Sequence, residues 1–252
     1  MGFNFSAPFS RLQRVGAIAI TWPAANQLRQ RPTPRRTSLR QFDNAVLREP
    51  SLSLLAAKRL LDILGSATGL LILALPLIGI AIAIKMTSPG PVFFRQKRYG
   101  YHNRRFWILK FRTMYVDLSD QRGTQQAKSD DPRVTPLGRI LRKASLDELP
   151  QLINVLKGDM SLVGPRPHVP GMLANGMLYE EFIPYYFQRH NMRPGVTGLA
   201  QVNGFRGITT DPAAALARVD CDLQYIEKWS LGLDIRIIVR TIMTELTSGS
   251  GH

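Results

Sequence analysis

Two neighbouring carboxylates, Asp147 and Glu148, are the side chains of this sequence best placed to do chemistry. An ionised carboxylate can act as a nucleophile, and two adjacent carboxylates can hold a divalent cation. The pair stands in a dense segment from Ser145 to Pro167, SLDELPQLINVLKGDMSLVGPRP, which ends in a Gly-Pro-Arg-Pro turn. The two prolines should fix the direction of Arg166, whose guanidinium fork suits a phosphate. This density of features predicts a reactive site.

A helix is predicted to present the carboxylate pair. Ser145 is followed three residues later by Glu148 and then by an apolar stripe, which is the pattern of a capping box. Gly158 should end the helix, and Asp159 should stabilise the turn after it. Acids in a first helical turn often serve only as caps, whereas the same positive helix end would keep Asp147 ionised and offer amides to a phosphate. Taken alone, the pair fits both interpretations.

Two short strands, 92–96 and 106–112, are predicted to pair as a hairpin across the turn-rich residues 99–103. Because side chains alternate along a strand, Lys110 and Arg112 should share one face and could reach the same anion. A solvated strand face explains the same pair more simply. We therefore take both residues as candidate phosphate ligands, with the solvated face as the alternative.

Composition limits the class of protein. A chain of 252 residues with 44% hydrophobic content can bury one compact core and still carry an extension. Its 33 Lys and Arg against 18 Asp and Glu give a net charge of +15, which favours a partner rich in phosphate, whether nucleotide, nucleic acid or anionic lipid. The single Cys221 excludes an internal disulfide, and the four histidines lack the spacing of a zinc site.

An apolar segment upstream of the carboxylates predicts contact with a membrane. Residues 63–84 carry no charge, and about 20 helical residues suffice to cross a bilayer. Pro76 in their middle should bend the helix, and basic residues crowd both flanks, which normally stay cytoplasmic. A helix that enters one leaflet, bends and returns explains both features, with a plain transmembrane span as the alternative. Asp62 should pair with Lys58 or Arg59 at the water boundary.

Five motifs in sequence order carry a resemblance to a known family: Lys58 to Asp62 with its apolar helix, 110–114 (KFRTM), the 145–167 segment, 193–198 (RPGVTG) and 200–204 (AQVNG). Together they make residues 55–246 similar to the bacterial sugar transferases, the monotopic polyprenol-phosphate phosphoglycosyl transferases. The resemblance implies transfer of a sugar 1-phosphate from a UDP-sugar to undecaprenyl phosphate, with UMP released and Mg²⁺ required. It further implies that Asp147 forms a covalent phosphosugar intermediate and that Glu148 helps to bind the metal.

Other candidate substrate ligands follow from the same motifs. Arg166 would clamp a phosphate, although a surface arginine that braces the loop is the alternative. Arg193, before Pro194, is either a second clamp or a loop ion-pair partner. Gln201 could hydrogen-bond a uracil, ribose or sugar hydroxyl, or be an ordinary turn residue. Residues 204–207 (GFRG) are similar to those of hexose-transferring members and favour glucose or galactose.

The sequence thus predicts a mostly helical α/β fold with a small β-hairpin or sheet. We expect a basic, disordered cytosolic tail (1–54), a re-entrant membrane helix (55–87), a compact catalytic domain with interfacial amphipathic helices (88–247) and a short tail (248–252). An apolar stripe along 233–246 could contact lipid or pack on the core. In the family, Ser-Pro is common at the helix break, whereas Leu75 stands here.

The expected location is the bacterial inner membrane, with the catalytic domain facing the cytosol and initiating exopolysaccharide synthesis. Membrane lipids and the two substrates are the expected partners, no nucleic acid is expected, and a homo-oligomer is compatible with the sequence. Two alternatives come from other classes of protein. A noncatalytic membrane scaffold would not need Asp147, Glu148 and Arg166 together, and a nucleic-acid-binding protein would have no use for the apolar segment.

Overall fold

The computed structural model describes residues 51–118, 131–174, 176–205, 207 and 211–248. The predicted tails at 1–54 and 248–252 lie outside these residues except at their inner ends. Helices predominate, and the sheets formed by the described residues have two strands each. The expectation of a mostly helical α/β fold with small sheets is confirmed.

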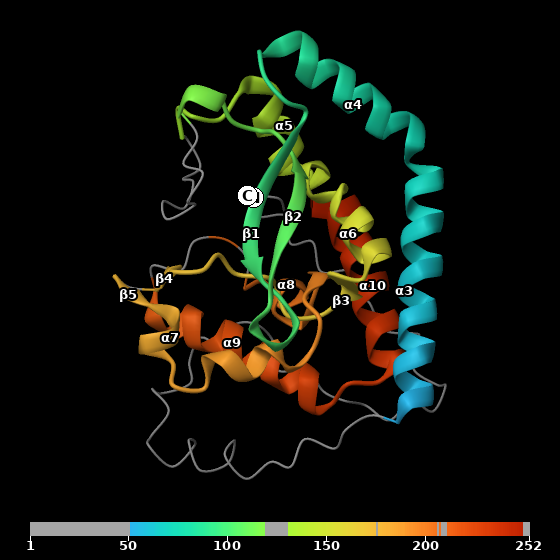
Figure 1. The fold of residues 1–252 in the computed structure, drawn as a ribbon, viewed down its shortest axis with the longest axis vertical. Helices are drawn as coiled ribbons and strands as arrows, with labels where there is room; N and C mark the ends of the chain where they lie inside the picture. Colours follow the sequence, from blue (N-terminus) through green and yellow to red (C-terminus); the bar gives the residue numbers. More distant parts are fainter. Residues whose placement is uncertain (1–50, 119–130, 175, 206, 208–210, 249–252) are drawn as a thin grey trace, which may run out of the picture.

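The apolar segment forms two helices, α3 (Leu52–Ile72) and α4 (Ala74–Thr87), which are bent by 63° at the break between them. Pro76 causes the break, because it donates no hydrogen bond and its ring crowds the carbonyl four residues earlier. α3 begins slightly before the predicted boundary because the Ser51 side chain accepts a hydrogen bond from the Leu54 amide at 3.4 Å. Figure 1 shows α3 along one side of the molecule and α4 turning away across its end.

Among the described residues, the bent pair of α3 and α4 has the length and apolar composition of a membrane segment. No single helix there is both long and apolar enough for a bilayer crossing, but α3 and α4 together meet the criterion by length and composition. A broken span and a re-entrant loop would both have this appearance. Re-entrance therefore stays a prediction.

The predicted hairpin is confirmed. Strands β1 (Phe93–Tyr99) and β2 (Arg105–Phe111) are antiparallel and pair from Phe93 opposite Phe111 to Tyr99 opposite Arg105. The short 3₁₀ turn η1 (Tyr101–Asn103) joins these two strands. The elements after them in chain order are η2 (Val116–Leu118), α5 (Pro136–Lys143), η3 (Leu146–Glu148), α6 (Gln151–Lys157), β3 (Ser161–Val163), β4 (Leu173–Ala174), β5 (Met177–Leu178), α7 (Tyr179–Phe182), η4 (Tyr186–Asn191), β6 (Gly195–Thr197), α8 (Leu199–Val202), α9 (Pro212–Glu227) and α10 (Leu231–Ser248). β3 and β6 pair in parallel, and β4 and β5 pair antiparallel.

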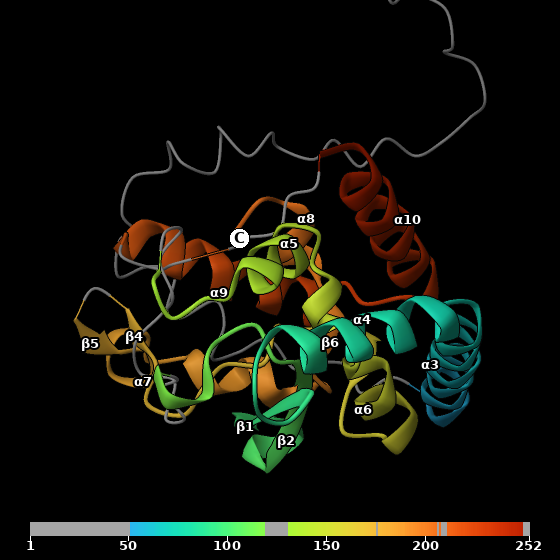
Figure 2. The same ribbon diagram turned by 90° about the horizontal axis from the view of Figure 1, so that it is seen from above.

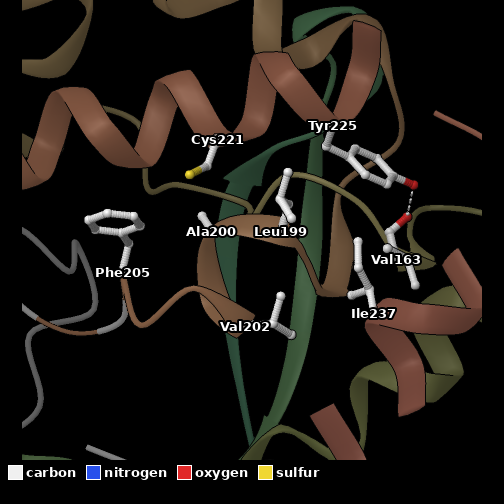
Figure 3. Packing of buried hydrophobic residues seen from close by; sticks show 8 residues of the cluster. All are labelled: Val163, Leu199, Ala200, Val202, Phe205, Cys221, Tyr225 and Ile237. Carbon is white, nitrogen blue, oxygen red and sulfur yellow. Dashed lines mark hydrogen bonds between the residues drawn. The ribbon is translucent and has the colours of Figure 1, made fainter. Parts of the chain in front are cut away.

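The core lies where α8, α9, α10 and β3 meet. Figure 3 shows this cluster, whose buried members are Val163, Leu199, Ala200, Val202, Phe205, Cys221, Tyr225 and Ile237. A second cluster joins the other end of α9 to α7 and η4. In Figure 2, α10 stands beside α3, and α4 leads away from α3 across the molecule. α3 is therefore packed against α6, β3 and α10.

The stripe predicted along the last helix is divided: Ile238 packs against the core cluster, whereas three other members point outward. Ile235, Val239 and Ile242 are 52%, 49% and 54% exposed, whereas Ile237 on the opposite side of α10 is 2% exposed. Ordinary core packing therefore does not explain these three residues. Trp229, which precedes α10, packs against the core cluster.

Candidate active site

The helix start predicted at Ser145 is not formed, so the capping box is a wrong prediction. Ser145 adopts a left-handed conformation with φ of 54°, its side chain caps nothing, and a short 3₁₀ turn, η3, carries the two acids. α6 begins only at Gln151. Two causes act here. Pro150 interrupts a helix that would begin at Ser145, because it donates no hydrogen bond and its ring crowds the Leu146 carbonyl. The Glu148 carboxylate also faces two cations from elsewhere in the fold, and these charge-assisted bonds are stronger than a bond to a neutral amide. Gly158, with φ of 89°, ends α6 as predicted.

Glu148 is clamped between Lys110 and Arg166. The Lys110 ammonium lies 2.6 Å from Oε1, while the Arg166 guanidinium donates to Oε1 at 2.6 Å and to Oε2 at 3.0 Å. Burial alone would raise the pKa of Glu148, but the charges and hydrogen bonds of Arg166 and Lys110 hold it well below its usual value. The structure thus brings together three of the predicted site residues from β2, η3 and the Gly-Pro-Arg-Pro turn.

Asp147 lies beside this clamp but differs from Glu148 in its hydrogen bonding and in its pKa. Asp147 is 9% exposed, and none of the described residues donates a hydrogen bond to its carboxylate. Burial raises its pKa to about 6 and the neighbouring Glu148 adds to the rise, against the opposing charges of Lys110, Arg142 and Arg166. A carboxylate without hydrogen-bond partners keeps its lone pairs available for attack on an electrophile.

We predict that Asp147 titrates near pH 6 in the protein without added metal. Since its pKa is raised from 3.8, the carboxyl is about nine-tenths protonated at pH 5 and about nine-tenths ionised at pH 7. Carbon-13 NMR of aspartate-labelled protein, with the spectrum of Asp147→Asn subtracted, measures the midpoint. A midpoint close to 4 would contradict the prediction.

The turn that carries Arg166 is held by two arginines that sequence reasoning missed. Arg189 donates to the Arg166 carbonyl at 2.6 Å and pairs with Asp222, and Arg98 donates to the Pro167 carbonyl at 3.2 Å. Arg189 is fully buried. The sequence held one signal for Asp222, because Arg218 and Asp222 stand four residues apart on α9. Charged residues at that spacing usually lie on a solvated face of a helix, so the signal did not predict a buried ion pair.

Arg193 lies in the loop before β6, and Gln201 lies on α8, close to the same turn. A Cβ on Gly164, Gly195 or Gly198 would overlap backbone atoms of the facing segment, so these glycines permit the close contact. Arg193 is exposed and lies over the Tyr101 ring at 5.6 Å, and Gln201 is buried and donates to the Val196 carbonyl at 3.2 Å. Their roles as substrate ligands stay predictions.

Arg112 is not directed to the site. Its guanidinium donates to the Ser88 carbonyl at 2.7 Å, to the Ser88 hydroxyl at 2.8 Å and to the Pro89 carbonyl. Lys110 and Arg112 therefore do not converge on one anion, contrary to the prediction. The carbonyls at the end of α4 have no helical partners and attract the cation more strongly than open solvent does.

We predict that Arg112→Met destabilises the protein by on the order of 2 to 4 kcal/mol, because it leaves several buried carbonyl groups unsatisfied. Thermal unfolding in one detergent measures the loss, with the exposed Arg139→Met on α5 as the matched control. An Arg112→Met protein with wild-type stability and weaker substrate binding would show instead that Arg112 is a ligand.

The predicted pairing of Asp62 with Lys58 or Arg59 is wrong. Asp62 accepts hydrogen bonds from Ser161, Lys58 pairs with Asp234 at 2.7 Å, and Arg59 donates to the Val155 carbonyl at 2.7 Å. These side chains face the protein, where the buried backbone of β3 and the end of α6 offer better partners than water.

Comparison with known proteins identifies a family. A profile described as "Bacterial sugar transferase" matches residues 53–248. The chain belongs to the bacterial sugar transferase family. The resemblance inferred from the five motifs is thereby confirmed, and the family region includes α3, α4 and every residue of the Glu148 clamp.

Curated relatives within this family differ in length. The exopolysaccharide production protein PSS of Rhizobium leguminosarum bv. phaseoli is 52% identical over 197 residues, which cover 78% of this chain and 98% of that protein. An undecaprenyl-phosphate glucose phosphotransferase of Komagataeibacter xylinus is 50% identical over 191 residues, 76% of this chain and 36% of that protein. A UDP-glucose:undecaprenyl-phosphate glucose-1-phosphate transferase of Caulobacter vibrioides is 46% identical over 203 residues, 81% of this chain and 74% of that protein.

Proposed function

We propose that this chain transfers glucose 1-phosphate from UDP-glucose to undecaprenyl phosphate and so initiates exopolysaccharide synthesis. The enzyme class, an undecaprenyl-phosphate sugar phosphotransferase, follows from the family and from the names of its relatives. Glucose is favoured because the Komagataeibacter and Caulobacter relatives are named for it. The observation that carries the mechanism is a contrast within one site. Asp147 accepts no hydrogen bond from the residues that the structure describes, whereas Glu148 is clamped by two cations.

The proposed reaction has two displacements at the sugar-bearing phosphorus. A carboxylate oxygen of Asp147 attacks this phosphorus, and its bond to the bridging oxygen breaks, so that UMP leaves with that oxygen. An oxygen of undecaprenyl phosphate then attacks the same phosphorus and releases the Asp147 carboxylate, which yields the undecaprenyl diphosphate sugar. Two steps suit two anionic substrates, because they never have to meet in a single transition state.

Lys110 and Arg166 are well placed to take up phosphate charge. In the described site both cations are paired with Glu148, so a bound diphosphate would share them with that carboxylate. Charge-assisted bonds to phosphate oxygens have the same chemistry as those already made to Glu148. The two cations would therefore orient the donor without becoming buried and unpaired in its absence.

The carboxylate pair also fits a magnesium ion. Groups of three or more His, Cys, Asp or Glu that could hold a metal do not occur among the described residues, and Mg²⁺ typically needs only one or two carboxylates plus substrate phosphates. Asp147 and Glu148 would hold it. The ion would supply charge neutralisation for the diphosphate and the leaving UMP.

Release of UMP tests the proposal. Purified protein in lipid nanodiscs is incubated with undecaprenyl phosphate, Mg²⁺ and a panel of UDP-glucose, UDP-galactose and their N-acetylated forms. We expect UMP release with UDP-glucose, and its loss when EDTA removes the metal. UMP release from another UDP-sugar alone would show that glucose is not the sugar transferred. If no UDP-sugar gave UMP, the proposed function would be overturned.

For the topology we propose a re-entrant α3–α4 pair in the inner membrane, with both flanks cytosolic. Support comes from the 63° bend and from the basic residues on both sides of the pair. In a Cys221→Ala background, Ser53→Cys and Arg95→Cys, both exposed, should react with an impermeant maleimide from the cytosolic side. Labelling from opposite sides would establish a true span.

A further inference from the structure

The first turns of α3 bind all three residues of β3. The Asp62 carboxylate accepts from the Ser161 hydroxyl and from the Leu162 amide, both at 2.9 Å. One helical turn earlier, the Lys58 ammonium donates to the Val163 carbonyl at 3.1 Å. Asp62 and Lys58 are 2% and 6% exposed, so these bonds lie in the interior, although the residues border the apolar segment.

A buried network fixes Lys58 in turn. Its ammonium lies 2.7 Å from the Asp234 carboxylate of α10, which also accepts from the Trp229 indole at 3.1 Å. The Tyr225 hydroxyl lies 2.8 Å from Asp234 and 3.0 Å from the Val163 carbonyl, the bond drawn in Figure 3. α3, α9, α10 and β3 are thereby joined at one point, and a lysine held this way has little freedom to move.

The same stretch of α3 contacts two elements that flank the candidate active site: β3, which precedes Arg166, and α6, which follows Glu148. β3 ends at Val163 and continues directly into the turn that presents Arg166. Arg59, between the two β3-binding residues, donates to the Val155 and Leu156 carbonyls at 2.7 and 2.8 Å, at the end of the helix that follows Glu148. α3 therefore spans the two elements whose separation sets the Arg166 to Glu148 contact.

We propose that Lys58 and Asp62 are positioning residues, which hold β3 so that Arg166 meets Glu148 and the donor phosphate in register. This inference rests on the proposed function. Its physical basis is that both side chains bind β3 backbone within a few residues of Arg166, and that a displacement of about 1 Å at a reacting centre can lower a rate about 100-fold. The anchorage of the apolar helix and the geometry of the catalytic site are then one structural unit.

A kinetic double-mutant cycle tests the inference. UMP release from UDP-glucose is measured in nanodiscs for Asp62→Ala, Arg166→Ala and the combined variant. We expect Asp62→Ala to lower kcat about 10- to 100-fold with little change in KM. If Asp62 acts through Arg166, the combined variant is no slower than Arg166→Ala alone, whereas independent effects would multiply.

Conservative variants separate positioning from folding. Asp62→Asn keeps an oxygen that can accept from the Leu162 amide and should restore most of kcat, and Ser161→Ala, which removes one donor to Asp62, should cost less than Asp62→Ala. Lys58→Met should resemble Asp62→Ala, and the exposed Lys157→Met on α6 is the charge control. If Asp62→Ala does not fold, the cycle is run with Ser161→Ala.

The outcomes distinguish the two hypotheses. A wild-type protein that releases no UMP from any donor overturns the proposed function. An active wild type whose Asp62 and Lys58 variants keep full kcat, or whose losses multiply with that of Arg166→Ala, overturns the positioning role alone.

Discussion

Replacing Asp147 by Asn should abolish UMP release, by a factor on the order of 10³ or more, because a neutral amide cannot attack phosphorus. The change is nearly isosteric, and no hydrogen bond to Asp147 from the described residues is lost with it. Because its pKa is raised by burial, removal of the charge should not destabilise the fold. Thermal unfolding checks this, and UMP release under single-turnover conditions measures the chemistry.

The proposed covalent intermediate gives a second readout for the same variant. Wild-type protein incubated with UDP-glucose in the absence of undecaprenyl phosphate should carry a hexose phosphate on Asp147, detectable by intact-protein mass spectrometry after acid quench. Asp147→Asn should carry none, and the exposed Asp117→Asn, as matched control, should behave like wild type. An Asp147→Asn protein that retains turnover would show that the lipid phosphate displaces UMP directly.

Replacing Arg166 by Lys should lower kcat about 100-fold although the charge is kept, because removal of one preorganised donor at a reacting centre has an effect of this size. Arg166 uses two nitrogens, at 3.0 and 2.6 Å, to bind both oxygens of Glu148. A lysine ammonium is a point charge on a flexible stem and does not reproduce this fork. Lys110 binds Oε1 of Glu148, so the loss of the fork would leave Oε2 without its fixed donor and the carboxylate without its fixed orientation.

Steady-state kinetics with UDP-glucose measure the effect on the Arg166→Lys variant. The exposed Arg95→Lys on β1 is the matched control and should retain wild-type kcat and KM. Wild-type kinetics for Arg166→Lys would show that charge alone is required, and that the turn merely braces the loop.

The acidic pair and its neighbours show which features local sequence patterns predict. Asp147 and Glu148 were identified from residue type and neighbouring motifs, and the hairpin and the Gly158 helix end were predicted from local patterns that local physics enforces. The helix start at Ser145 was wrong for a specific reason. A capping pattern describes only hydrogen bonds within a few residues. Glu148 instead forms ion pairs with Lys110 and Arg166, which are distant in sequence.

The polar residues bordering the apolar helix show the same limit. Lys58, Arg59 and Asp62 were expected to pair with one another because they are one turn apart, but each is bound to a segment far along the chain. Arg112 illustrates the converse: strand alternation placed it beside Lys110, yet the end of α4 offered carbonyls with no other partner. Pairing of buried charges depends on which groups the fold removes from water, and this is not encoded locally.

By itself the sequence determined the family, the hairpin and the bend before Pro76, and it singled out Asp147 and Glu148 as candidate carboxylates, because these follow from ordered motifs and from short-range sterics. Only the tertiary structure decided which cation meets which carboxylate, and that α3 holds β3. The Ser145–Pro167 segment contains both acids and Arg166, but their contact requires β3, α6 and α3 to be packed together, and packing is a property of the whole chain.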